Sequence, residues 1–284
     1  MQVPNITTIS ASGLPSEIMR LHKPPSRLFA QGNLDLLHRH PRAGIVGARK
    51  FTNYGREVTV NIASALAREG VTIVSGLAIG VDSIAHKACL DNGGKTIAVL
   101  PSGLQNIYPA SHYGLAKNII GQNGLLVTEY PEKFRPHKVS FLERNRIIAA
   151  LSDVLIITEA AVSSGSLNTA NYALELGIPI MAVPGNITSP YSAGTNNIIK
   201  SGAYPLTDSS DVLSLLGIEP SDKSAYIPES KPEQAIINTL KSGITSTNEL
   251  LAGSKLDVST AQTTLTLLEM KGIVSAQAGH WYIN

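Results

Sequence analysis

Two turns in this chain carry glycine and serine residues at spacings that suit phosphate binding. The first reads Ser75-Gly76-Leu77-Ala78-Ile79-Gly80-Val81-Asp82 and follows a β-branched run from Val71 to Val74. A helical stretch begins at Asp82, so the turn presents backbone N–H groups and a helix N-terminus to an anion. We therefore expect the backbone around Gly76 and Gly80 to bind phosphate.

The second turn reads Ser163-Ser164-Gly165-Ser166-Leu167-Asn168-Thr169. It lies between an apolar run, Val154 to Thr158, and a helical pattern that continues to Leu176. Its hydroxyl and N–H groups are suited to surround a phosphate at the start of that helix. The alternative is a serine-rich helix cap that binds no ligand.

A third segment combines arginines with an aromatic residue. Phe141 opens a helical pattern that contains Arg144, Asn145 and Arg146, and Lys133, Arg135, His137 and Lys138 precede it. An aromatic among basic residues suits single-stranded nucleic acid, because bases stack on the ring and phosphates pair with the cations. The alternative is a set of arginines on a solvated helix face.

Together these segments give an expected set of residues that bind DNA or phosphate. We expect Arg49, Arg144 and Arg146 to contact phosphates from loops at one edge of a sheet, and Phe141 to stack on a base. The full expected set is Arg49, Gly76, Gly80, Lys138, Phe141, Arg144, Asn145, Arg146, Ser164, Gly165 and Ser166.

Strands and helices alternate through most of the chain. The expected strands are Ala43 to Val46, Val71 to Val74, Thr96 to Leu100, Leu125 to Thr128, Val154 to Thr158 and Ile180 to Val183. Strands that are apolar on both faces and joined through helices predict an α/β fold with a doubly wound parallel sheet. Ligands bind such sheets outside the carboxyl ends of the strands, where the turns above fall.

Composition shifts predict four segments. Residues 1–40 read as an irregular lead-in packed on the main domain, 41–217 as the sheet domain and 218–232 as a polar linker. Residues 233–284 hold three helical patterns and a hairpin, which predict a small C-terminal winged-helix domain. From Ile218 onward there are five Lys against seven Asp and Glu, and no arginine.

The overall composition narrows the class of protein. The net charge is only +2 and the one cysteine, Cys89, excludes an intrachain disulfide framework and a multi-cysteine metal site. No apolar run approaches the roughly 20 residues that span a bilayer. We expect a cytoplasmic protein that has no membrane span and binds neither a metal nor a cofactor.

Two segments resemble enzyme or metal-site motifs but lack a residue that each motif requires. Gly94-Lys95-Thr96 imitates the end of a Walker A motif, but Cys89 stands where its first glycine belongs. Asp82 and His86 are four residues apart, a spacing found at metal sites, but a third ligand is not evident. We interpret that pair as a hydrogen-bonded structural feature.

In their order, these motifs resemble those of the DNA-processing protein A family (DprA, also called Smf). The resemblance covers about residues 25–216 and also includes the turn at Gly47, Tyr108-Pro109, and the stretches Ala182 to Asn186 and Gly194 to Asn196. It implies an extended Rossmann-like domain that forms a homodimer and binds single-stranded DNA in a basic pocket. It also implies loading of a RecA-type recombinase onto incoming DNA in natural transformation, without catalysis.

The chain departs from that family's pattern at three positions. Ile79 stands where members often carry Lys or Arg, Leu142 replaces a usual proline, and Glu143 adds a negative charge near the expected site. The last long helical pattern, Ser259 to Lys271, has Lys271 as its one basic side chain. A helix that reads duplex DNA usually carries several basic or amide side chains. We therefore expect that domain to contact protein or to bind DNA weakly.

The alternative function is enzymatic. Glu143-Arg144 followed by a strand and a Gly-Ser turn also resembles the Lonely Guy nucleotide phosphoribohydrolases. Those enzymes carry a glutamate shortly after the turn, where a carboxylate stabilises the sugar cation. Thr169 occupies that position here, so we expect binding rather than hydrolysis.

Overall fold

The computed structural model describes residues 5–219, 228–277 and 279–283. The chain divides into two compact units, Met1–Pro220 and Ser221–Asn284, each with an apolar core of its own. The expected linker, residues 218–232, lies largely outside the described residues. Ile218 packs on the core of the first unit, and Lys231 begins the first helix of the second.

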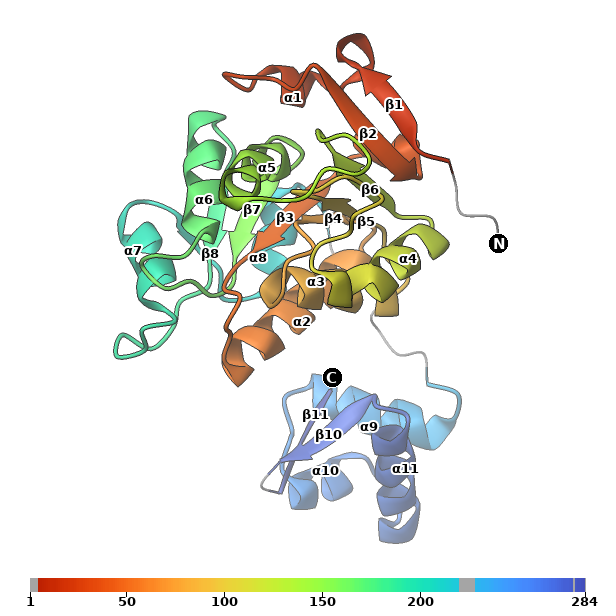
Figure 1. Ribbon diagram of the computed structural model, residues 1–284. Coiled ribbons are helices and arrows are strands. Elements are labelled where there is room, and N and C mark those ends of the chain that lie inside the picture. Colours follow the sequence, from red (N-terminus) through yellow and green to blue (C-terminus); the bar gives the residue numbers. More distant parts are fainter. Residues whose placement is uncertain (1–4, 220–227, 278, 284) are drawn as a thin grey trace. The chain divides into compact units, whose positions relative to one another are not determined.

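Within the described residues the first unit is built on a nine-stranded sheet in the order β1-β2-β6-β5-β4-β3-β7-β8-β9 (Figure 1). The strands from β6 to β9 along that order are parallel, and β1 and β2 are antiparallel to their neighbours. Their bounds are β1 Thr7–Ser10, β2 Arg27–Gly32, β3 Arg42–Val46, β4 Thr72–Ser75, β5 Thr96–Val99, β6 Leu125–Thr128, β7 Val154–Ile157, β8 Ile180–Ala182 and β9 Tyr204–Pro205.

Helices cover both faces of this sheet. The residues of α2, α3 and α8 share one core cluster with β3, β4 and β7, and those of α5 and α6 share another on the opposite side. The bounds are α1 Ser16–Met19, α2 Asn53–Arg68, α3 Val81–Asp91, α4 Tyr113–Gly121, α5 Lys138–Ala150, α6 Ser166–Glu175, α7 Ala193–Lys200 and α8 Ser209–Leu215. The expected doubly wound, mostly parallel α/β fold is confirmed.

The strand order reverses at β3. After β3 the chain adds β4, β5 and β6 on one side, and it then returns to place β7, β8 and β9 on the other. The loops after β3 and after β7 leave the sheet in opposite directions, which opens a crevice at the carboxyl ends of these two strands. The fold therefore places a ligand site beside Gly47 and Ala161.

The expectation of an irregular lead-in is wrong for part of residues 1–40. Residues 7–10 and 27–32 form β1 and β2, which extend the sheet beyond β6. Leu28 and Ala30 are fully buried, so the alternation of this strand buries one face. β2 is not the edge of the sheet, because β1 pairs with it and takes the edge position.

The second unit contains three helices and a hairpin within its described residues. These are α9 Lys231–Lys241, α10 Thr247–Gly253, α11 Val258–Met270, β10 Val274–Gln277 and β11 His280–Ile283. Ile236, Leu240, Leu250, Leu265 and Leu268 form its buried core. The expected winged-helix domain is confirmed. Among the described residues of both units, none of the helices combines the length and the apolarity that a membrane span needs.

Candidate nucleic-acid interface

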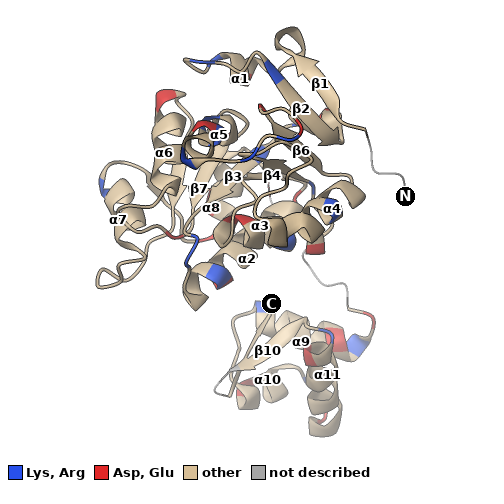
Figure 2. Ribbon diagram, in the orientation of Figure 1, with Lys and Arg blue, Asp and Glu red and all other residues tan. Residues whose placement is uncertain are grey.

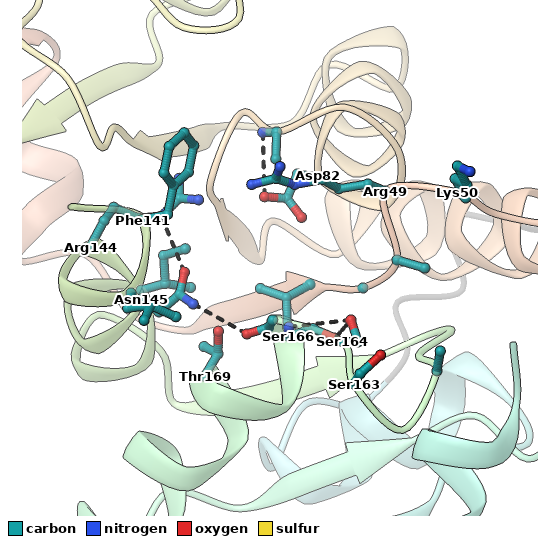
Figure 3. A pocket seen from close by; sticks show the side chains of 18 of the residues that line it. Arg49, Lys50, Asp82, Phe141, Arg144, Asn145, Ser163, Ser164, Ser166 and Thr169 are labelled. Carbon is teal, nitrogen blue, oxygen red and sulfur yellow. Dashed lines mark hydrogen bonds between the residues drawn. The ribbon is translucent and has the colours of Figure 1, made fainter. Parts of the chain in front are cut away.

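A cavity of about 680 Å³ opens at the crevice predicted by the strand order. Its walls come from the turn after β3, the turn after β4, the first turns of α5 and the loop before α6 (Figure 3). Of the expected set, the residues that line it are Arg49, Lys138, Phe141, Arg144, Asn145, Ser164, Gly165 and Ser166. The structure thus brings together segments that are more than 100 residues apart in the sequence.

Positive charge dominates the cavity. Arg49, Lys50, Lys138 and Arg144 line it, and Asp82 is the one carboxylate among the described lining residues. Arg49, Lys50 and Lys138 are exposed, whereas Arg144 is buried. Lys138 begins α5 after a connection that also carries Lys133 and Arg135, and Figure 2 shows Lys and Arg on that connection. Three cations are therefore available to phosphates in solvent.

Arg144 holds the floor of the cavity together. Its side chain donates to the carbonyl oxygens of Gly76 and Val99, and its Nε donates to Oδ1 of Asn145 at 3.3 Å. Burial lowers the pKa of Arg144 to about 10, which still leaves it charged near neutral pH. Because Gly76 directly follows β4 and Val99 is the last residue of β5, Arg144 fixes the turn after β4 to the end of β5.

Asp82 completes this buried network from the other side. Its carboxylate accepts the N–H of Gly76 at 3.1 Å and that of Ala78 at 3.4 Å. Burial raises the pKa of Asp82, and the charge of Arg144 opposes that shift. His86 lies nearby but does not bond to Asp82. Its Nδ1 contacts Oγ1 of Thr96 at 2.6 Å, so the expected pair is two buried residues with different partners.

Gly76 and Gly80 shape the turn rather than lining the main cavity. A Cβ on Gly76 would overlap the Arg144 guanidinium, and a Cβ on Gly80 would overlap the carbonyl oxygen of Ala48. Gly80 also has a φ of 95°, which side-chain-bearing residues rarely adopt. Gly76 and the exposed Ile79 line a smaller adjoining pocket of about 40 Å³. Close packing on the Arg144 side chain explains Gly76, and close packing on the backbone at Ala48 explains Gly80.

Arg146 lies away from the cavity. Its side chain forms an ion pair with Glu129, and only 13% of it is exposed. Residues two apart on a helix project in very different directions, so Arg144 and Arg146 cannot both face the crevice. Glu143 also points elsewhere and accepts a hydrogen bond from the Tyr130 hydroxyl at 2.5 Å. The expectation that Arg146 faces the cavity is wrong.

Phe141 is half-buried at the cavity wall. The Arg49 guanidinium carbon lies 5.1 Å from the centre of its ring, and Tyr108 contacts it edge-on with ring centres 5.4 Å apart. A cation over a ring face is a favourable contact. One face of Phe141 is therefore covered by Arg49, and a base that stacks there must displace the guanidinium.

The loop before α6 offers polar groups as expected. The hydroxyls of Ser164 and Ser166 lie 2.7 Å apart, and Nδ2 of Asn145 donates to the carbonyl oxygen of Gly165 at 3.3 Å. Gly165 and Ser163 are exposed, and Ser166 is buried at the start of α6. These groups face the cations across the cavity (Figure 3).

Several polar lining residues were absent from the expected set, namely Lys50, Asp82, Tyr108, Ser163, Thr169 and Tyr191. Lys50 directly follows Arg49 in the turn after a strand, and this position in the sequence indicates a second cation at the same edge of the sheet. Tyr191 lies in a long connection between β8 and α7, where no sequence pattern marks it.

Helix α11 of the second unit presents little charge to a partner. Glu269 is the one charged residue of α11 (Figure 2). Lys271, just after that helix, is ion-paired with Glu229 at 2.7 Å and with Glu233 at 3.0 Å. The helix that reads DNA in many winged-helix proteins therefore has no basic side chain of its own here.

Comparisons with known proteins show relatives of both units. The chain matches the family model for DNA recombination-mediator protein A over residues 5–217 and the DprA winged helix domain model over residues 219–280. It is 38% identical to the DNA processing protein DprA of Bacillus subtilis over 208 residues, which are 73% of this chain and 70% of that protein.

Two solved structures are similar to about three quarters of this chain. The X-ray structure of DNA processing protein A from Streptococcus pneumoniae superposes with a TM-score of 0.70 and 37% identity, and covers 74% of each chain. That of the Helicobacter pylori protein has a TM-score of 0.69 and 35% identity, and covers 75% of this chain and 95% of that one. The latter work concerns the single-stranded DNA binding mode of the Helicobacter pylori protein.

Proposed function

The chain belongs to the DNA recombination-mediator protein A family, and we propose that it binds single-stranded DNA in the cavity beside β3 and β7. The observation that carries this proposal is the composition of the cavity: four cations against one carboxylate, with Phe141 in the wall. Cations pair with phosphates and aromatic rings stack on bases, the combination used for single strands.

The size and position of the cavity support a nucleotide as its occupant. Its volume of about 680 Å³ falls within the roughly 300–1,000 Å³ of small-molecule pockets. A base in a duplex is stacked and paired, so it cannot enter such a pocket without being extruded. We therefore expect the protein to prefer single strands to duplexes of the same length.

Phe141 is the residue proposed to stack on a base. Phe141→Ala should weaken single-strand binding by about 1–3 kcal/mol, while Phe141→Trp should be tolerated. If Phe141 only fills the wall, the alanine variant would instead lose thermal stability with little change in affinity. Melting and binding measured on the same variant distinguish these roles.

We further propose that the protein acts in the cytoplasm as a homodimer and loads a RecA-type recombinase onto incoming single strands during natural transformation. The match to a recombination-mediator family over residues 5–217 supports this role. A direct test is filament formation by a purified recombinase on an oligonucleotide coated with single-strand binding protein. Addition of this protein should shorten the lag before filaments form, and an unchanged lag would count against loading.

The alternative, nucleotide phosphoribohydrolysis, has less support from the site. Thr169 lines the cavity where that reaction needs a carboxylate, and Asp82 is held by two backbone N–H groups. Incubation with adenosine monophosphate followed by analysis for free adenine tests this alternative. Accumulation of adenine with time would require the proposal of a binding protein to be revised.

The binding proposal itself is tested by competition. A labelled single-stranded oligonucleotide bound to the intact chain should be displaced by unlabelled single strand at lower concentration than by duplex. Equal displacement by both would show that the cavity does not select unpaired bases.

A further inference from the structure

Three exposed aromatic side chains belong to segments at the cavity or next to it in the sequence. Phe51, Tyr54 and Tyr191 are 39%, 47% and 36% exposed. Tyr191 lines the cavity together with Lys50, and Phe51 follows Lys50 in the chain. Rings that expose this much apolar area next to a ligand site need a reason, because aromatic side chains stabilise a protein most when buried.

The segment that carries Phe51 is fixed in place. The neighbouring Thr52 donates its N–H and its hydroxyl to the two carboxylate oxygens of Glu159, at 2.9 and 2.8 Å. Glu159 is only 2% exposed, and the Thr52 hydroxyl also caps α2 by accepting the N–H of Gly55 at 3.1 Å. Phe51 therefore projects from a rigid turn.

Tyr54 is held beside the segment that leads to Tyr191. Its hydroxyl donates to the carbonyl oxygen of Pro184 at 2.8 Å. The next residue, Gly185, packs so closely on Ser192 that a Cβ there would overlap the serine side chain. The chain from Tyr191 to Ser192 thus lies next to the residue that anchors Tyr54, so the segments that carry Tyr54 and Tyr191 are neighbours.

We infer that Phe51, Tyr54 and Tyr191 form a second base-stacking surface, the exit platform, for nucleotides that leave the cavity past Lys50. This inference rests on the proposed single-strand binding. The surface continues the cavity wall, and the exposed cations Arg49 and Lys50 stand where the two meet. Rings interleaved with cations bind successive nucleotides of a single strand without regard to sequence.

The exit platform predicts a dependence on oligonucleotide length. Phe51→Ala should weaken binding of an oligothymidylate of about 20 nucleotides by about fivefold or more, and leave binding of one of about 3 nucleotides unchanged. Tyr54→Phe keeps the aromatic ring and should bind the longer oligonucleotide with nearly wild-type affinity. Tyr282→Ala, which removes a ring of similar exposure (45%) in the second unit, is the matched control and should bind both lengths normally.

Phe51→Trp provides a direct reporter of stacking. The chain has one native tryptophan, Trp281, in the second unit. The longer oligonucleotide should quench the additional emission of this variant, and the shorter one should not. Sedimentation of Phe51→Ala and of the wild type gives the oligomeric state of each.

The outcomes separate this inference from the proposed function. If the wild type binds neither oligonucleotide, both fail. If Arg49→Ala weakens binding but Phe51→Ala binds both lengths like the wild type and Phe51→Trp is not quenched, the exit platform is refuted and single-strand binding stands. A change of oligomeric state in Phe51→Ala, without an effect on length dependence, would assign this face to an interface between copies and would also overturn the inference.

Discussion

The guanidinium of Arg144 lies against the Cα of Gly76 and donates a hydrogen bond to the carbonyl oxygen of the same residue. Asp82 accepts the N–H of Gly76 from the other side. The turn after β4 is therefore held between a buried cation and a buried carboxylate. Arg144 is only 4% exposed, so it supports the cavity, whereas Arg49 is exposed to solvent, where a phosphate can reach it.

This difference predicts opposite phenotypes for two arginines that look alike in the sequence. Arg144→Ala should lower the free energy of unfolding by about 3–5 kcal/mol, because the carbonyl oxygens of Gly76 and Val99 lose a charged donor and buried Asp82 loses the nearby positive charge. Arg49→Ala removes the contact with the Phe141 ring and should lower stability by no more than about 1 kcal/mol, while it should weaken single-strand binding by about 1–3 kcal/mol. Urea unfolding and fluorescence anisotropy measure the two effects. An Arg144→Ala protein of normal stability would contradict the supporting role.

Arg146 should matter for stability and not for binding. Arg146→Ala leaves Glu129 largely buried without its partner, which should cost roughly 1–3 kcal/mol of stability. Burial already raises the pKa of Glu129, so Glu129→Gln in the same chain should recover part of the loss. Single-strand affinity of the single variant should stay within about threefold of the wild type. A tenfold loss of affinity in a folded Arg146→Ala protein would place this arginine at the interface after all.

Buried His86 predicts a sensitivity to acid. Burial, with a smaller effect of Arg144, lowers its pKa from 6.5 to about 3. Between these two values the unfolded chain binds a proton at His86 and the folded chain does not. Stability must then fall as the pH falls, by up to about 1.4 kcal/mol per pH unit.

His86→Gln should flatten this dependence. Urea unfolding at intervals from pH 7 to pH 4 gives the slope for each protein, and only the difference between slopes is attributed to His86. Equal slopes would mean that another group governs the response to acid.

The winged-helix unit should be dispensable for single-strand binding. α11 carries Glu269 as its one charged residue, and Lys271 is ion-paired. A chain that ends at Gly217 keeps the complete sheet and every arginine. It should bind single strands within about threefold of the intact chain. A tenfold loss, with the shortened protein still folded by circular dichroism, would assign DNA contacts to the second unit.

The parallel part of the fold was predictable because its strands are buried on both faces. Runs such as Val154–Ile157 are apolar throughout and end in turn residues, which leaves few alternative assignments. β1 was not predictable in this way. Thr7–Ser10 is short, polar and mostly exposed, and only pairing with β2 makes it a strand.

The site was predictable in position but not in detail. The position of the crevice follows from the strand order. The sequence therefore predicted that Arg49, Phe141 and the loop at Ser164 would lie close together, and all three line the cavity. The roles of the arginines in α5 depend on partners elsewhere in the fold. Arg146 forms an ion pair with Glu129. Arg144 donates hydrogen bonds to the carbonyl oxygens of Gly76 and Val99. No pattern within one helix reveals partners on other strands.

The most direct test of the account is the salt dependence of single-strand binding by the intact chain and by one variant. Arg49, Lys50 and Lys138 are its exposed cavity cations, and their replacement by alanine should leave the fold intact. The logarithm of the wild-type affinity should fall linearly with the logarithm of salt concentration. The triple variant should bind weakly, and the magnitude of its slope should be lower by about 2. A triple variant with wild-type affinity and slope would contradict the claim that this cavity binds DNA.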